Sequence, residues 1–259
     1  MPAAPDHFPA GAPCWADLSS SDPGRAREFY AGLLGWDAVD LGREYGHYFH
    51  FLRNGSVVAG LMQNSQETGF PDFWTVYLSS DDARATADSA TAAGGQVLLG
   101  PGMAVDQGSV AVLGDPTGGT VGVWQPETHR GFARIDEPSA PVWYELMTND
   151  YAAALDFYRT VFGWETEVLS DTEDFRYTTL QSEDRPVAGV MDAAAELPGG
   201  IPSHWEIYFG HADIGAAAEQ AEQLGGSVLR LPEDSDYGRL VQLADPTGAA
   251  FWLMAATEA

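Results

Sequence analysis

The sequence contains a single cysteine, Cys14, among 259 residues. One thiol cannot close an internal disulfide or build a cysteine-rich metal site. No apolar run approaches the roughly 20 residues that span a membrane. The opening MPAAPDHFPAGAP lacks the basic stretch and apolar run of a secretory signal. These absences predict a cytoplasmic protein with no membrane partner.

Basic residues are also scarce, with 12 Lys and Arg against 38 Asp and Glu and a formal net charge of −26. A field of this sign repels nucleic acid and anionic lipid, so we expect neither as a partner. The chain has no Gly-rich phosphate loop and no G-x-S-x-G nucleophile elbow. Nucleotide-binding and serine-hydrolase chemistry are therefore not indicated.

What the sequence does contain is a long internal repeat. CWADLSSSDPGRAREFYAGLLGW (Cys14 to Trp36) returns as VWYELMTNDYAAALDFYRTVFGW (Val142 to Trp164), at a spacing of 164 − 36 = 128 residues. Later segments match in the same order, with the spacing drifting only to 131: VVAGLM with PVAGVM, FWTVYL with HWEIYF, and LGDPTGG with LADPTGA. A period of this length indicates two copies of a whole domain.

Each copy is predicted to contain two units of strand, helix and further strands. In the first unit Asp22 caps a helix with Pro23 at its first position, and Gly35 ends it. The turn Arg53-Asn54-Gly55 is a strong hairpin signal. The expected strands of the first copy cover residues 12–18, 45–52, 57–63, 74–78, 96–99, 109–113 and 120–124, and its second helix covers 82–93.

These patterns predict an α+β fold, in which four β-α-β-β-β units form two curved mixed-sheet cups by tandem duplication. A tail of residues 1–11 precedes a first domain of residues 12–125. A linker rich in Pro and charge covers residues 126–140, and the second domain covers 141–255.

The order of these motifs resembles the vicinal oxygen chelate superfamily, which includes glyoxalase I, extradiol dioxygenases, fosfomycin-resistance enzymes and bleomycin-binding proteins. The resemblance rests on SD or ND before a helix that ends in FY-x-x-LLGW, then AAGG, then DPTG before a last strand. It covers nearly the whole chain and implies two glyoxalase-like domains. The two-copy form is similar to bacterial members labelled hydroxylase-like, some of which belong to antibiotic pathways.

The resemblance also implies a divalent metal held by His, His or Gln, and Glu. The matching positions are Trp15, Thr75 and Gly122 in the first domain and Trp143, Glu206 and Trp252 in the second. Only Glu206 could be a ligand, because indole offers no lone pair to a metal and glycine has no side chain. We therefore expect no metal and no other cofactor.

Alternate residues of a strand share a face, which predicts what each cup contains. The first cup is expected to hold Trp15, Asp17, His50, Tyr77 and Trp124, and the second to hold Trp143, Glu145, His204, Glu206, Tyr208, Trp252 and Met254. Aromatic walls with carboxylates suit a flat, conjugated small molecule. The tryptophans would equally suit a closed core, and Arg25 or Arg27 would make Asp17 structural by neutralising it.

Two carboxylates on facing strands raise one pKa and supply an acid and a base, so Glu145 and Glu206 are the predicted catalytic pair. The predicted function is metal-independent acid/base tailoring of a flat aromatic or polyketide-like molecule, by a lyase, isomerase or hydroxylase-like enzyme in antibiotic biosynthesis. The alternative is a non-catalytic protein of the bleomycin-resistance type that sequesters such a molecule. Four units in one chain equal those of a dimer of single-domain relatives, so we expect a monomer.

Overall fold

The computed structural model describes residues 4–5, 7–65, 69–172, 174–197 and 201–255. The first copy contains β1 (Pro13–Ser20), α1 (Pro23–Leu34), β2 (Asp37–Asp40), the 3₁₀ turn η1 (Arg43–Tyr45), β3 (Phe49–Arg53), β4 (Ser56–Gln63), β5 (Phe73–Ser79), α2 (Ala83–Ala92), β6 (Gln96–Met103), β7 (Gly108–Gly114) and β8 (Thr120–Pro126). The second contains β9 (Pro141–Thr148), α3 (Tyr151–Phe162), β10 (Glu165–Asp171), β11 (Arg176–Ser182), β12 (Arg185–Asp192), β13 (His204–His211), α4 (Ile214–Gln223), β14 (Ser227–Ser235), β15 (Gly238–Ala244) and β16 (Ala250–Ala255).

Each copy forms one eight-stranded mixed sheet. The strand order is β2-β3-β4-β1-β5-β8-β7-β6 in the first sheet and β10-β11-β12-β9-β13-β16-β15-β14 in the second. At the centre, β1 runs antiparallel to β5 and parallel to β4, and β9 relates to β13 and β12 in the same way. The predicted α+β duplication with two curved sheets is confirmed, and each sheet is built from two consecutive units.

The helix that opens each copy begins and ends at the predicted residues. The Asp22 side chain accepts a hydrogen bond from the backbone N–H of Arg25, Pro23 occupies the first turn, and Gly35 ends α1 with a φ of 67°. Asp150 and Gly163 have the same roles in α3. Glycine suits the final position because a left-handed backbone is strained for residues with a Cβ.

The strand expected at residues 45–52 is wrong in its first half. Residues 43–45 form η1, and a left-handed backbone follows at Gly46 and His47, with φ values of 66° and 58°. The chain becomes extended only at Phe49, where β3 begins and pairs with β2. Gly42 and Gly46 explain the difference, because their positive φ angles make a tight turn that apolar periodicity does not reveal.

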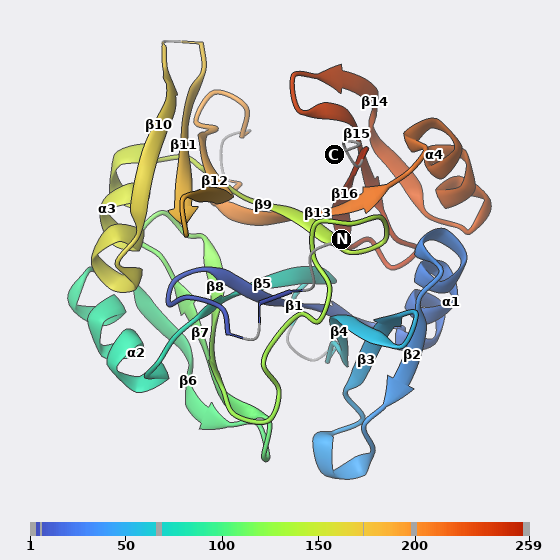
Figure 1. Ribbon diagram of the computed structural model, residues 1–259, viewed down its shortest axis with the longest axis horizontal. Coiled ribbons are helices and arrows are strands. Elements are labelled where there is room, and N and C mark those ends of the chain that lie inside the picture. Colours follow the sequence, from blue (N-terminus) through green and yellow to red (C-terminus); the bar gives the residue numbers. More distant parts are fainter. Residues whose placement is uncertain (1–3, 6, 66–68, 173, 198–200, 256–259) are drawn as a thin grey trace.

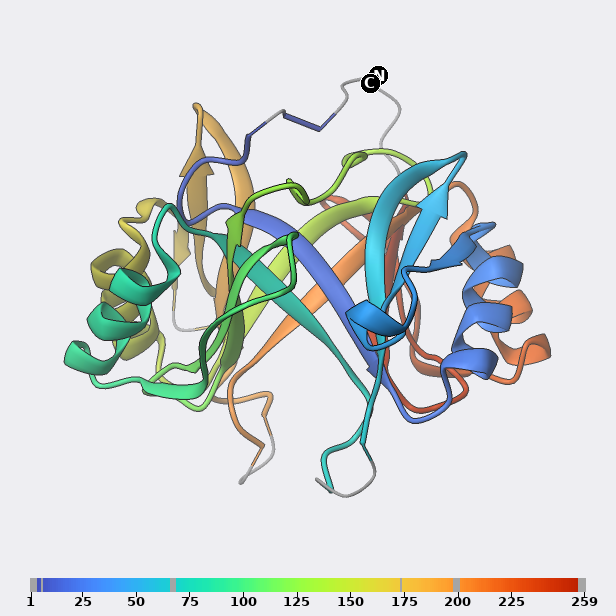
Figure 2. The ribbon, with the colours of Figure 1, turned by 90° about the horizontal axis from the view of Figure 1, so that it is seen from below.

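The two sheets lie back to back, and their concave faces open away from each other (Figure 1). The helices form two pairs at the ends of the molecule, α1 beside α4 and α2 beside α3 (Figure 2). Between the sheets, Trp36 and Trp74 of the first copy pack on Phe209 of the second, with ring centroids 5.1 and 5.2 Å apart. The core is therefore shared by both copies. No helix in the described part of the chain is long and apolar enough to cross a membrane.

The repeated FY and DPTG motifs meet across this shared core. The Tyr158 hydroxyl donates to the Asp115 carboxylate at 3.0 Å and accepts from Trp205 Nε1 at 2.9 Å. The mirrored pair is Tyr30 and Asp245: burial, followed by the negative charge of Asp245, raises the pKa of Tyr30. Each DPTG turn therefore places its aspartate beside a tyrosine of the opposite domain.

The segments before β1 and β9 are also equivalent. Trp164 Nε1 donates to the Gly11 carbonyl at 2.9 Å, and Trp36 Nε1 donates to the Ser139 carbonyl at 2.8 Å. The two acceptors are 139 − 11 = 128 residues apart, which is the repeat spacing. The linker is also packed rather than solvated at Phe132, which is 3% exposed and contacts the Trp15 ring.

We expect Tyr158→Phe to lower the free energy of unfolding by roughly 1–3 kcal/mol, because it removes a partner from buried Asp115 and Trp205. Chemical denaturation of the variant and of the wild type measures the change. Tyr237→Phe, at an exposed hydroxyl-bearing position, is the matched control and should be neutral. Equal stability of the two variants would show that the cross-domain bond is not stabilising.

Candidate functional site

The first cup contains a cavity of about 390 Å³. Its walls come from the strands of the first sheet, the η1 turn and the linker. The predicted residues Trp15, Asp17, His50, Tyr77 and Trp124 all line it. The remaining lining is Ser19, Leu41, Glu44, Tyr45, Tyr48, Met62, Phe73, Thr75, Leu99, Met103, Ala104, Val105, Gln107, Val110, Val112, Thr120 and His129. A volume of this size falls within the range of small-molecule sites.

A buried carboxylate held by two tyrosines lies in this cup. The hydroxyl of Tyr48 donates to Asp17 Oδ2 at 3.1 Å, and that of Tyr77 lies 3.1 and 3.2 Å from the two carboxylate oxygens. Trp15 Nε1 donates to the Tyr48 hydroxyl at 2.9 Å. Gly60 makes room for Tyr48, since a Cβ there would lie 1.8 Å from the hydroxyl oxygen.

Burial raises the pKa of Asp17 to about 6, and the two tyrosine hydrogen bonds offset part of this effect. The expectation that Arg25 or Arg27 neutralises Asp17 is wrong. The Arg27 side chain instead donates to the Pro23 carbonyl and lies over the Phe49 ring. Arg25 makes its described hydrogen bond through its backbone N–H to Asp22. Asp17 is therefore stabilised by neutral hydroxyl donors, which leave its proton exchangeable near neutral pH.

The second cup repeats this arrangement. Glu145 accepts hydrogen bonds from the hydroxyls of Tyr177 at 2.6 Å and Tyr208 at 2.8 Å. Trp143 Nε1 donates to the Tyr177 hydroxyl at 3.1 Å, and Gly189 leaves room for that hydroxyl as Gly60 does in the first cup. Burial is the largest cause that raises the pKa of Glu145 to about 7, and the charge of Glu206 adds to it.

The two cups differ in how much space remains. Trp252 stacks on Tyr208 with the rings 6° from parallel and 5.4 Å apart, whereas the equivalent position in the first cup is Gly122. Glu206 accepts a hydrogen bond from Gln242 at 2.8 Å, whereas the first cup has Thr75 and Val112 at these positions. Larger side chains therefore occupy the second cup.

The other predicted residues of the second cup lie as follows. Glu206 is directly opposite Glu145 in the pairing of β13 with β9. His204 Nε2 lies 3.7 Å from Glu206, which raises the pKa of His204. Met254 is on β16, two residues beyond Trp252. Glu206 Oε2 and Trp252 Nε1 are buried and have no hydrogen-bond partner among the described residues.

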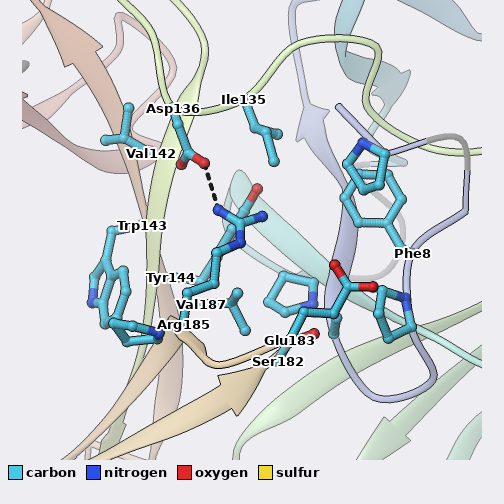
Figure 3. A pocket seen from close by; sticks show the side chains of 15 residues that line it. Phe8, Ile135, Asp136, Val142, Trp143, Tyr144, Ser182, Glu183, Arg185 and Val187 are labelled. Carbon is cyan, nitrogen blue, oxygen red and sulfur yellow. Dashed lines mark hydrogen bonds and ion pairs between the residues drawn. The ribbon is translucent and has the colours of Figure 1, made fainter. Parts of the chain in front are cut away.

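A smaller cavity, of about 70 Å³, lies where the N-terminal segment, the linker and the β11–β12 hairpin meet (Figure 3). Arg185 from the hairpin pairs with Asp136 of the linker at 2.9 Å. Phe8 and Trp143 are also in its wall. This volume holds only a few water molecules at about 30 Å³ each, so it is too small for a polycyclic molecule.

Two residues of the first cup were missed by sequence reasoning, namely Tyr48 and His129. Tyr48 had a detectable signal, because Tyr177 stands 177 − 48 = 129 residues later, within the repeat spacing. His129 had none, because it lies in a linker without apolar periodicity. Its ring is 4.3 Å from that of Trp15 and 5.0 Å from that of His50.

The residues at the expected metal-ligand positions do not form a metal site. Trp15 and Trp143 donate their indole N–H groups to tyrosines, and Trp252 stacks on Tyr208. Among the described residues, no group of three or more His, Cys, Asp or Glu is placed to hold a metal ion. The donor set of this chain does not fit the divalent metal of metal-dependent relatives.

The sequence model of the Glyoxalase/Bleomycin resistance protein/Dioxygenase superfamily matches residues 14–123 and 140–253, one match to each copy. The chain belongs to this superfamily. Membership agrees with the two repeated units and with the curved sheets described above.

Relatives within the superfamily resemble the whole chain. It is 35% identical over 246 residues to the Mycobacterium tuberculosis protein named "Putative glyoxylase CFP32", with 93% of each chain covered. It is 34% identical to the anthracycline biosynthesis protein DnrV of Streptomyces peucetius, over 94% of this chain and 93% of DnrV.

Among solved structures, the fold is similar to that of the Mn(II)-bound glyoxalase from Novosphingobium aromaticivorans. The TM-score is 0.66 at 16% identity, covering 96% of this chain and 83% of that one. The 2,3-dioxygenase LapB from Pseudomonas sp. KL28 gives a TM-score of 0.64 at 12% identity, covering 96% and 93%. At these identities the likeness shows the shared fold alone.

The raised pKa of Asp17 makes a prediction about stability. Between its unfolded value near 4 and its folded value of about 6, the folded state keeps a proton that the unfolded state releases. This contribution to the free energy of unfolding is therefore lost as pH rises through that window. Asp17→Asn removes the titration, so its stability relative to wild type should increase by roughly 2 kcal/mol from pH 4 to pH 7.

Denaturant unfolding of both proteins across that pH range measures this difference. Asp37→Asn, at an exposed strand position, provides the control and should follow the wild-type curve. Parallel curves for wild type and Asp17→Asn would show that Asp17 titrates at an ordinary value in the folded protein.

Proposed function

We propose that the first cup binds a flat aromatic or polyketide-like small molecule and that the protein performs metal-independent acid/base chemistry on it. The observation that carries the proposal is the cavity of about 390 Å³, walled by aromatic rings beside the buried Asp17. Indole and phenol rings suit the face of a conjugated ligand. The name of DnrV, an anthracycline biosynthesis protein, supports this ligand class and a place in antibiotic biosynthesis.

Asp17 is the group proposed to move the proton. With a pKa of about 6, it is mostly ionised at neutral pH and yet retains a usable proton affinity, which suits a general acid and base. The proposed step transfers a proton from an enol hydroxyl or an activated C–H of the ligand to the Asp17 carboxylate. The same proton then returns to a different ligand atom, so the reaction is an isomerisation without an oxidant.

Our proposal differs from the sequence prediction in the choice of cup. Glu145 and Glu206 remain a facing carboxylate pair, but Trp252 and Gln242 occupy the space beside them. The first cup has Gly122 and Val112 at the equivalent positions, and an open cavity. Space for the ligand next to a carboxylate with a raised pKa favours the first cup.

The alternative function is sequestration of the same class of molecule without chemistry. Both oxygens of Asp17 already lie within hydrogen-bond distance of tyrosine hydroxyls, an arrangement that also suits a purely structural carboxylate. Stacking walls alone are sufficient for binding. The two functions differ in one observable, which is proton exchange on a bound carbon acid.

Anthrone is a suitable probe, because it is a flat tricyclic ketone whose C10 hydrogens exchange through its enol. We expect the wild-type protein in D₂O, under anaerobic conditions, to accelerate deuterium uptake at C10 as followed by proton NMR. Asp17→Asn should lower this rate at least about a hundredfold while the dissociation constant for anthrone changes only a few-fold. Asp37→Asn should exchange at the wild-type rate.

Binding without acceleration would support sequestration and rule out the enzyme. Equal rates in wild type and Asp17→Asn would remove Asp17 from the chemistry. Loss of exchange in Glu145→Gln or Glu206→Gln, with Asp17→Asn still active, would move the site to the second cup. Absence of anthrone binding by the wild type would contradict the proposed ligand class.

Filling the cavity provides a separate test of its location. Gly122→Trp gives the first cup the residue that the second cup has at this position, and a Cβ at Gly122 would lie 2.1 Å from Tyr77 Cδ1. The Tyr77 ring must move and the indole takes up the cavity, so anthrone affinity should fall at least about tenfold. Fluorescence titration measures the loss. Unchanged affinity, in a variant with native circular dichroism, would place the ligand elsewhere.

A further inference from the structure

His129 is the polar group of the first cup that neither the repeat nor the superfamily accounts for. It lies in the linker after β8, and its ring lines the cavity. The Trp15 ring meets it edge-on at 4.3 Å, and the Trp124 ring lies 5.5 Å away. Both tryptophans are buried, so His129 stands in the aromatic wall itself.

The position of His129 is fixed by its backbone. Trp124 Nε1 donates to the His129 carbonyl at 3.0 Å, and the His129 N–H donates to the Gln107 carbonyl at 3.1 Å. The Gln107 carbonyl also accepts from the N–H of Glu127 at 3.0 Å, which holds the linker against the β6–β7 turn. A side chain on so constrained a backbone has a defined direction before any ligand arrives.

The imidazole itself has an unmet hydrogen-bonding need. His129 Nε2 is buried and has no partner among the described residues. Buried polar atoms are nearly always paired, and an unpaired one in a cavity wall indicates a missing partner. His50, the neighbouring imidazole at 5.0 Å, lines the same cavity, whereas the second cup has Thr179 at its equivalent position, bonded to the Glu167 carbonyl.

The two histidines stay uncharged at neutral pH. Burial, together with the nearby His50, lowers the pKa of His129 to about 3, and burial also lowers the pKa of His50. No arginine is among the residues that line the cavity, whereas Asp17 and Glu44 are. An anionic ligand would find no counter-charge here, so the group that meets His129 is neutral.

We propose that His129 selects the ligand by a hydrogen bond to a hydroxyl group on its aromatic ring, which makes a neutral hydroxyarene or enol the ligand class of the first cup. A neutral imidazole has one donor and one acceptor nitrogen, and a hydroxyl pairs with either tautomer at Nε2. A ketone pairs with only one of them. The inference rests on the proposed function for its site, and it gives His129 a positioning role, because so weak a base is not suited to take the proton.

Two matched fluorescent probes test this, 2-naphthol and 2-methoxynaphthalene, which share a ring system but differ in one hydroxyl hydrogen. We expect the wild type to bind 2-naphthol more tightly. His129→Leu should weaken 2-naphthol binding about tenfold and leave 2-methoxynaphthalene binding within about twofold, since one hydrogen bond is lost. His129→Gln, whose amide can replace the imidazole as a partner, should recover most of the affinity.

His7→Leu, at an exposed histidine remote from the cavity lining, is the control and should match the wild type. A second measurement does not depend on the folding of His129→Leu: the ¹⁵N resonances of the His129 ring, identified by their absence in His129→Gln, should shift on adding 2-naphthol and stay in place with 2-methoxynaphthalene.

Equal losses for both probes in His129→Leu, or equal ring shifts with both, would reduce His129 to a packing role and overturn the inference while leaving the proposed function intact. Full affinity for 2-naphthol in His129→Leu would overturn it in the same way. If the wild type binds neither probe nor anthrone, the proposed function itself fails.

Discussion

The central constraint in this protein is a carboxylate buried in the middle of each sheet and held by two tyrosine hydroxyls. Asp17 and Glu145 occupy equivalent positions on β1 and β9, and both have a raised pKa because burial disfavours their charged forms. The first tyrosine of each pair needs a glycine opposite it, at Gly60 or Gly189, since a Cβ there would overlap the hydroxyl. The conserved geometry of both cups follows from satisfying this one group without a cation.

Duplication supplied two copies of this arrangement, and a few substitutions then separated them. Gly122 leaves the first cup open, while Trp252 closes much of the second by stacking on Tyr208. The linker adds His129 to the first cup. One framework therefore carries an accessible polar site on one side and a nearly filled counterpart on the other. The buried but unpaired Glu206 Oε2 marks where the second cup remains incompletely packed.

The fold could be predicted from the sequence because its signals are local and repeated: a capping aspartate before Pro23, a glycine at position 35, and a turn at Asn54-Gly55. Most residues of the first cup followed from strand alternation. Which cup has space could not be predicted, because volume depends on how Trp252 and Tyr77 turn in three dimensions. His129 was not predictable either, because its placement depends on long-range contacts of the linker with Trp15 and Gln107.

The bond between Trp164 and the Gly11 carbonyl joins residues 153 positions apart. During synthesis, the segment before β1 is made first, but its tryptophan partner leaves the ribosome only after most of the second copy has begun to emerge. The Tyr158–Asp115 bond imposes the same order. The first sheet must therefore wait, with its back face uncovered, for the second to be translated. A pause or truncation within the second copy would leave an apolar surface for a chaperone to cover.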